Sequence, residues 1–398
     1  MDRHHQADAT KASPHEETWE EANFSTDFTP YTSRRIQLYY PSLSPIRSFK
    51  NPVSAHAKAS CIDIRSVDTS GMTLLDVCNY MPQPNVDGSG HCVWMGAMYF
   101  IHALSIGLAF SEVEGDITDT NSTGTKEGLS NDCWYNMFQQ KRVAELGCGT
   151  GAAGIALLKL LHLKSSPLSL KSSSMEPREF HFWDNDPEAL DLCQQNCENS
   201  INSIEAKYQL DPGWKLDSEI STKGEDVISK SFDTIFATDV LYDLKIIRPF
   251  LETASRMLAS NSSTTTINAL GNETTQNEKD KEAEKYLILS HIPRWYLPRD
   301  GTSSSSKPAG DQARRLETHI VHEASECKFS LRHTVRPREI LSQYQMLVNS
   351  RKNGDGYKSK NNTTHSDLIE ELRDMDQADA VLWVFSRRDN DVEESVRS

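Results

Sequence analysis

The chain has 398 residues, of which 37% are hydrophobic and 25% are charged, and its formal net charge is −15. The modest hydrophobic share indicates an ordinary folded core interrupted by polar, disordered insertions. The acidic balance argues against broad binding of nucleic acid or of an anionic membrane, because both need Lys and Arg gathered on one face. It suits a basic protein partner, although plain solubility explains the same charge.

The first part of the chain is predicted to carry little of the core. Residues 1–35 are polar and lack a hydrophobic period, which predicts a disordered tail. Residues 36–90 are predicted as an N-terminal extension, in which the short apolar runs Ile36–Tyr40 and Met72–Val77 are candidate strands of a hairpin. Val93–Phe110 carries no formal charge, but its polar residues and short length favour a buried helix over a membrane span.

Residues 91–390 are predicted to form one α/β domain. Strands and helices alternate along it, which indicates a mostly parallel sheet with helices on both faces. The last two strands lack a long apolar helix between them, so we expect an antiparallel hairpin at one sheet edge. The predicted strands are Arg142–Leu146, Phe180–Trp183, Phe232–Ala237, Tyr286–Ser290, Cys327–His333 and Ala380–Phe385, and the predicted helices are Ile155–Leu161, one opening at Pro187, and 244–258.

Polar segments of biased composition separate these elements. The segments 163–177, 259–284, 300–312 and 351–366 are rich in Ser, Thr, Asn, Lys or Gly, and 111–131 is acidic. Such composition predicts solvated loops that lengthen ordinary connections.

The eight cysteines are scattered, and none forms a Cys-x-x-Cys pair, so the sequence predicts no metal site. Cys193 and Cys197 lie four apart on a predicted helix, where we expect thiols that face the core. The first residues are polar and lead into no apolar run, so we expect no secretory signal and a cytoplasmic or nuclear location.

The segment Glu145–Gly151 joins a predicted strand to a predicted helix. Glycines permit a tight turn and a close approach of the backbone to a bound nucleotide. The spacing of Gly147, Gly149 and Gly151 differs from the Gly-x-Gly-x-x-Gly of dinucleotide folds. A structural turn explains the glycines alone. Glu145, however, would repel a pyrophosphate and attract an ammonium group, which favours S-adenosylmethionine, a ligand with an amino-acid end, a sulfonium and no phosphate.

Two acids follow the second predicted strand. Asp184 closes this strand, where a carboxylate accepts hydrogen bonds from the two hydroxyls of a ribose. Asp186 is the rival for that role, but it precedes a helix that opens at Pro187, and Asp is a favoured N-cap. We therefore assign the ribose to Asp184 and the cap to Asp186.

Asp239-Val240-Leu241-Tyr242 follows the strand Phe232–Ala237, at the strand end where ligands of parallel sheets gather. Asp239 and Tyr242 are candidate catalytic residues, since a carboxylate orients an amine nucleophile and an aromatic ring lines a channel. The alternative is structural, with Tyr242 packed on the core and Asp239 capping the helix from 244.

Taken together, Glu145–Gly151, Asp184 and Asp239–Tyr242 resemble the motifs of the seven-strand S-adenosylmethionine methyltransferases. The Asp-x-x-Tyr after the fourth strand resembles the protein-lysine subgroup called methyltransferase family 16. Val93–Ala97 is similar to the Trp-containing segment that leads into that domain, and Phe329–His333 is similar to a strand of the methyltransferase-like protein 22 group.

The resemblance, which covers roughly 90–386, implies a Rossmann-like seven-stranded sheet and S-adenosylmethionine as cofactor. It implies that Trp94 lies near the cofactor, and Asp217 is the candidate for contact with the adenine. Methyltransferases that act on planar amide or exocyclic amino nitrogens carry an Asn/Asp-Pro-Pro-Tyr motif at the position that begins with Asp239 here. This chain has Val240-Leu241 in place of the two prolines, which disfavours such substrates.

The resemblance implies a methyltransferase that acts on a lysine of a protein substrate, such as a chaperone or a member of another complex, and we expect a monomer with no nucleic-acid or membrane partner. Two alternatives stay open. One is a small-molecule N- or O-methyltransferase, and the other is a non-catalytic module that uses the cofactor fold to bind a partner.

Overall fold

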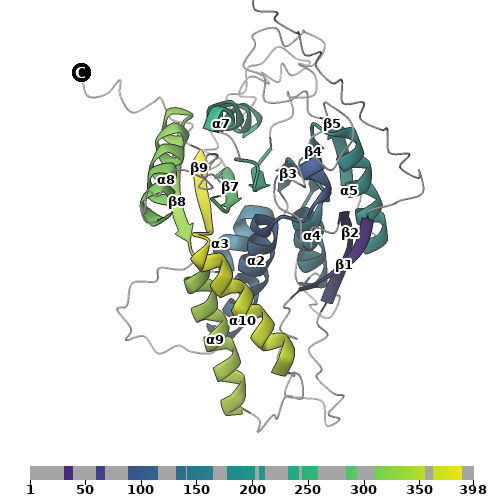
Figure 1. The fold of residues 1–398 in the computed structure, drawn as a ribbon, viewed down its shortest axis with the longest axis vertical. Helices are drawn as coiled ribbons and strands as arrows, with labels where there is room; N and C mark the ends of the chain where they lie inside the picture. Colours follow the sequence, from purple (N-terminus) through teal and green to yellow (C-terminus); the bar gives the residue numbers. More distant parts are fainter. Residues whose placement is uncertain are drawn as a thin grey trace, which may run out of the picture.

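The structure is a computed structural model (Figure 1). It describes residues 31–38, 60–67, 88–114, 131–139, 141–164, 177–201, 206–210, 232–241, 244–258, 284–293, 309–354 and 362–387. The strands are β1 (Tyr31–Leu38), β2 (Ser60–Val67), β3 (Arg142–Leu146), β4 (Glu179–Asp184), β5 (Ala206–Leu210), β6 (Thr234–Thr238), β7 (Tyr286–His291), β8 (Phe329–Val335) and β9 (Val381–Arg387). The helices are η1 (Gly88–His91), α2 (Met95–Glu114), α3 (Asn131–Phe138), α4 (Ala152–Lys164), α5 (Pro187–Ser200), α7 (Leu244–Leu258), α8 (Ala309–Glu326), α9 (Pro337–Gly354) and α10 (Asn362–Gln377).

Seven strands form one sheet in the order β5-β4-β3-β6-β7-β9-β8. The neighbours from β5 to β7 are parallel, whereas β9 runs antiparallel to both β7 and β8. The predicted mostly parallel, Rossmann-like sheet is confirmed. The antiparallel pair at one edge is also confirmed, but it is not a simple hairpin, because α9 and α10 lie between its two strands in the chain.

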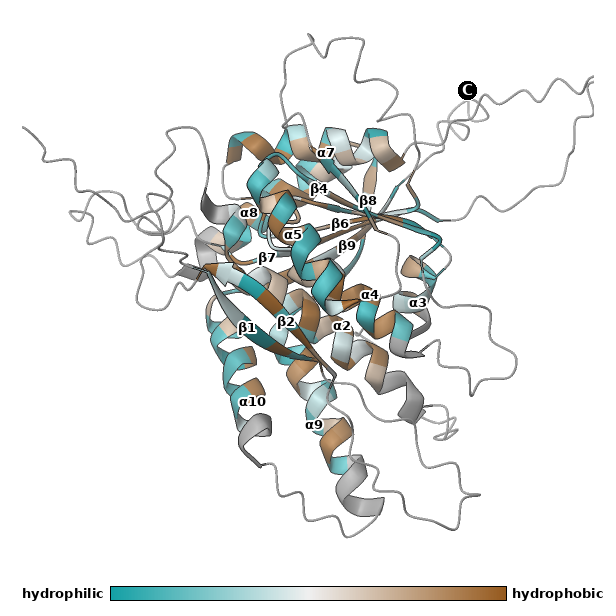
Figure 2. Cartoon of the chain, turned by 90° about the vertical axis from the view of Figure 1, so that its right-hand side faces the viewer, coloured by the Kyte–Doolittle hydropathy of each residue, from teal (hydrophilic) through white to brown (hydrophobic). Residues whose placement is uncertain are grey.

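The sheet separates two hydrophobic clusters. Helix α7 lies on one side of the sheet, and α2, α9 and α10 lie on the other (Figure 2). Side chains alternate between the two sides along β6, since Ile235 and Ala237 pack into one cluster while Phe236, between them, packs into the other. This alternation places the core on both faces and leaves the strand ends for the site.

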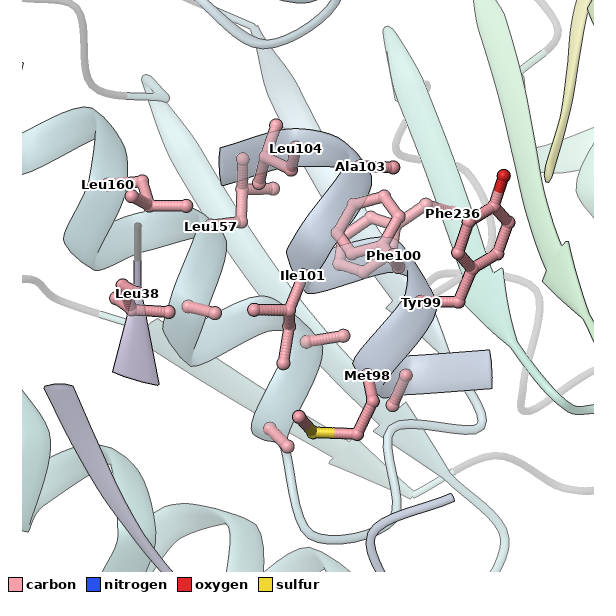
Figure 3. Close-up of a cluster of buried hydrophobic side chains, with 14 of the residues drawn as sticks. Leu38, Met98, Tyr99, Phe100, Ile101, Ala103, Leu104, Leu157, Leu160 and Phe236 are labelled. Carbon is pink, nitrogen blue, oxygen red and sulfur yellow. The ribbon is translucent and has the colours of Figure 1, made fainter. Parts of the chain in front are cut away.

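Helix α2 is the helix predicted over Val93–Phe110, and it is buried as expected. The side chains from Ala97 to Ala109 are almost all shielded from solvent, and the ring of Phe100 stacks on Phe236 with centroids 5.0 Å apart (Figure 3). Within the described part of the chain, no helix is long and apolar enough to span a membrane.

The N-terminal extension contains a two-stranded antiparallel sheet, β1 paired with β2. Its apolar side chains Ile36, Leu38, Ile62 and Ile64 are buried in the cluster that also holds α2 and α4. Strand β1 begins at Tyr31, inside the stretch 1–35 predicted as a disordered tail, so the predicted boundary at residue 35 is wrong. The candidate strand Met72–Val77 lies outside the described residues.

Several loops predicted from polar composition are shorter in the structure than expected. Helix α2 extends to Glu114 and α3 begins at Asn131, so both reach into the predicted loop 111–131. Helix α8 begins inside 300–312, and α9 and α10 occupy both ends of 351–366. Helices α8, α9 and α10 are polar overall, but α8 buries a stripe at four-residue spacing, Leu316, Ile320 and Ala324, which is sufficient to hold an amphipathic helix on a core.

Candidate functional site

The loop between β3 and α4 is shaped by three glycines. Gly147, Gly149 and Gly151 have φ of 66°, 50° and 76°, which is the left-handed region that side chains rarely adopt. A Cβ on Gly149 would lie 2.8 Å from the backbone oxygen of Gly90, and one on Gly151 would lie 2.5 Å from the sulfur of Cys193. The loop therefore strongly favours glycine at these positions, as expected of the tight turn that the sequence predicts.

Glu145 lies under this loop, inside the strand β3. Its side chain is buried, and its Oε2 accepts a hydrogen bond of 3.1 Å from the backbone N–H of Gly154. Its Oε1 is buried and has no hydrogen-bond partner within the described residues. Burial raises the pKa of this carboxyl well above its ordinary value. A buried oxygen that lacks a partner favours a ligand group that supplies a donor or a positive charge.

Asp184 closes β4, beside the glycine loop. One of its carboxylate oxygens accepts a 2.7 Å hydrogen bond from the N–H of Gly149, and the other accepts one of 3.0 Å from the N–H of Asp186. Burial raises the pKa of this carboxyl. Asp186 is the N-cap of α5 and accepts from the N–H of Glu188 at 2.9 Å. The structure thus gives Asp186 the predicted cap and leaves Asp184 facing the glycine turn.

Asp239 follows β6 and adopts a φ of 57°. Its Oδ2 accepts a 2.6 Å hydrogen bond from the N–H of Gly96, and its Oδ1 accepts one of 3.0 Å from the N–H of Ile292. Nδ1 of His291 lies 3.9 Å from the same carboxylate. The carboxylate therefore caps the first turn of α2 and joins it to the ends of β6 and β7. The structural alternative, a cap on the helix from 244 with Tyr242 packed on the core, stays a prediction, because residues 242 and 243 lie outside the described residues.

Trp94 immediately precedes α2, where its backbone oxygen accepts from the N–H groups of Ala97 and Met98. Its half-buried side chain packs in a small cluster with Val67 and Cys92. The segment is fixed to the sheet by the Asp239 bond to Gly96, and by a second bond in which the hydroxyl of Ser290 donates to the oxygen of Gly96 at 2.7 Å.

The structure therefore gathers Glu145, the three glycines and Asp184 at the ends of β3 and β4, with Asp239 on the neighbouring strand β6. Tyr242 and Asp217 lie outside the described residues. Sequence reasoning did not single out Ser290 or His91, because their partners are distant in the chain. Cys193 and Cys197 are buried as predicted, and the described residues contain no group of three or more His, Cys, Asp or Glu suited to a metal.

Known proteins resemble the chain at two levels. Residues 81–283, just over half of the 398 residues, match the family model of methyltransferase family 16, described as "Lysine methyltransferase". No curated protein matches the chain. The match ends before Phe329–His333, so the methyltransferase-like protein 22 group stays a prediction.

Solved structures that match the chain include a TehB-like SAM-dependent methyltransferase from Corynebacterium glutamicum, with 13% identity, a TM-score of 0.30, and coverage of 63% of this chain and 82% of that one. The N-methyltransferase NodS from Bradyrhizobium japonicum has 12% identity, a TM-score of 0.30, and coverage of 63% and 88%. A ribosomal protein L11 methylase from Lactobacillus delbrueckii subsp. bulgaricus has 13% identity, a TM-score of 0.31, and coverage of 63% and 71%. From its family match, the chain belongs to methyltransferase family 16, a lysine methyltransferase family among the S-adenosylmethionine-dependent methyltransferases.

Proposed function

We propose that this chain transfers a methyl group from S-adenosylmethionine to the side-chain amine of a lysine in a protein substrate. The single observation that supports the cofactor most strongly is the buried Oε1 of Glu145, which has no hydrogen-bond partner among the described residues and lies under a loop that strongly favours glycine. The family match supports the lysine.

The residues at the ends of β3 and β4 fit this cofactor. Glu145 would hold its ammonium group, and the glycine loop lets the backbone approach the ligand without interference from Cβ atoms. Asp184 accepts from backbone N–H groups that include those of Gly149 and Asp186, and we propose that its carboxylate also accepts from a ribose hydroxyl of the cofactor. When bound, the cofactor supplies a methyl group on a sulfonium, which transfers without a metal.

We propose that the carboxylate of Asp239 orients the incoming amine at the neighbouring strand end. Its hydrogen bonds from the N–H groups of Gly96 and Ile292 fix the position of both oxygens at the end of β6. A lysine must lose its proton before it attacks, and a desolvated channel favours the neutral amine. The protein contributes alignment and exclusion of water. Tyr242 keeps its sequence-based assignment as a residue that lines the channel.

The test is transfer of radiolabelled methyl from the cofactor to a cell extract whose own methyltransferases have been inactivated by heat. Purified chain should label protein bands, and mass spectrometry of those bands should find methylated lysine. A Gly149→Leu variant is the control, because its side chain would meet the oxygen of Gly90. Label confined to small metabolites would instead support the small-molecule alternative. Bound cofactor without any label would support the non-catalytic partner module.

A further inference from the structure

A chain of three side chains connects the N-terminal hairpin to the candidate cofactor site. The hydroxyl of Tyr31, the first residue of β1, lies 2.7 Å from Nδ1 of His91 in η1. Nε2 of the same imidazole lies 3.1 Å from Oδ2 of Asp186. His91 is 1% exposed and Asp186 is 8% exposed, so the two groups meet away from solvent.

The chemistry of the three side chains fixes which group donates each hydrogen bond. A carboxylate only accepts hydrogen bonds, so Nε2 of His91 must carry a hydrogen and donate a hydrogen bond to Asp186. In the neutral imidazole Nδ1 is then an acceptor, and the hydroxyl of Tyr31 donates to it. Burial, with the charge of Glu188, raises the pKa of Tyr31, so its hydroxyl keeps that proton. Burial alone would raise the pKa of Asp186, but the bonds from His91 and from the N–H of Glu188 lower it.

The Asp186 end of this hydrogen-bond network reaches the groups assigned to the cofactor. The N–H of Asp186 donates to Asp184, whose other oxygen accepts from Gly149 in the glycine loop. The segment that carries His91 also lies against this loop, because a Cβ on Gly149 would come within 2.8 Å of the oxygen of Gly90. His91 therefore lies between the β1–β2 hairpin and the β4–α5 turn that contains Asp184 and Asp186.

We propose that Tyr31, His91 and Asp186 are positioning residues, through which the N-terminal hairpin holds Asp184 in the orientation that binds the cofactor ribose. This inference rests on the proposed function. It makes the β1–β2 hairpin, which lies outside the residues of the family match, a working part of the cofactor site.

The test compares Tyr31→Phe with a matched control on the same hairpin. Tyr31→Phe removes one oxygen and leaves Nδ1 of His91 without its donor. We expect it to raise the KM for S-adenosylmethionine, and the Kd for S-adenosylhomocysteine in calorimetry, by about fivefold while kcat at saturating cofactor stays within about twofold. The control, Arg35→Gln, breaks the exposed ion pair with Asp63 at 2.8 Å and should leave both constants unchanged.

A double-mutant cycle separates a relay from general loosening of the hairpin. His91→Phe keeps a ring but removes both hydrogen bonds, so it should weaken cofactor binding more than Tyr31→Phe. Adding Tyr31→Phe to His91→Phe should then change the KM no further. Additive effects, an unchanged KM in Tyr31→Phe, or a loss confined to kcat would overturn the relay. If the unmodified chain bound no S-adenosylhomocysteine at all, the proposed function itself would fail.

Discussion

At the scale of single residues, Glu145 carries the most informative environment. Its carboxyl is buried, one of its oxygens has no hydrogen-bond partner in the part of the chain that the structure describes, and burial raises its pKa well above the ordinary value of 4.5. The folded state therefore keeps the proton at pH values where the unfolded state has lost it. This contribution to stability is full below pH 4.5 and declines as the pH rises toward the raised pKa.

Glu145→Gln should remove that pH dependence. Gln retains an acceptor for the N–H of Gly154 and does not titrate, so the variant should gain stability relative to the unmodified chain as the pH rises from 4.5 to 8. Thermal unfolding at several pH values measures this, and a pH-independent difference would contradict it.

Glu145→Gln should also lower the affinity for the cofactor by about tenfold or more, because a hydrogen bond to a charged group contributes about 1.5–3 kcal/mol. Binding of an ammonium group favours the ionised carboxyl, so it should also release a proton. Calorimetry of the unmodified chain in buffers of different ionisation enthalpy should detect that proton, and Glu145→Gln should not release it.

Asp239→Asn tests the proposed amine-orienting carboxylate. Asn replaces one oxygen with an NH2 group, so either Gly96 or Ile292 loses its acceptor, at a cost of about 1–3 kcal/mol in stability. We expect kcat to fall by at least about tenfold, as loss of a positioning group does, with cofactor affinity preserved. Asp233→Asn is the control. Asp233 precedes β6, at the opposite end of the strand from Asp239, and its carboxylate likewise accepts from a backbone N–H, that of Arg142. A parallel loss of cofactor affinity in Asp239→Asn would instead limit this residue to holding α2.

At the scale of elements, α2 joins the core to the site. Phe100 is buried and stacks on Phe236, so Phe100→Ala should cost about 3–5 kcal/mol. Met95, in the first turn of the same helix, is 44% exposed, and Met95→Ala should change stability by no more than about 0.5 kcal/mol. The urea midpoints of the two variants measure this contrast, and equal midpoints would show that the buried face does not anchor the helix.

The elements also show which features sequence could predict. The glycine turn and the helix cap at Asp186 depend on residues within a few positions of each other, and local chemistry identified them. The bond between Gly96 and Asp239 spans 143 positions, and that between His91 and Asp186 spans 95, so no local pattern contains them. The sequence also predicts a loop over 351–366 from its polar composition, whereas α9 and α10 extend into both ends of that segment.

At the scale of the whole molecule, one sheet brings the glycine loop, Asp184 and Asp239 to the same set of strand ends, and the N-terminal hairpin is bonded to them through His91. If this is a cofactor site, a ligand that binds only the folded chain must stabilise all of it. S-adenosylhomocysteine at a hundred times its Kd should add about 2.7 kcal/mol to the free energy of unfolding. A thermal scan that shows no shift at that concentration would contradict this.

The most direct measurement is calorimetric titration of S-adenosylhomocysteine into the unmodified chain and into Gly149→Leu. The account predicts saturable binding of one molecule per chain, and no binding to the variant, because its side chain would occupy the space between the glycine loop and the oxygen of Gly90. No heat of binding to the unmodified chain, or equal binding to both proteins, would contradict the assignment of the cofactor to this loop.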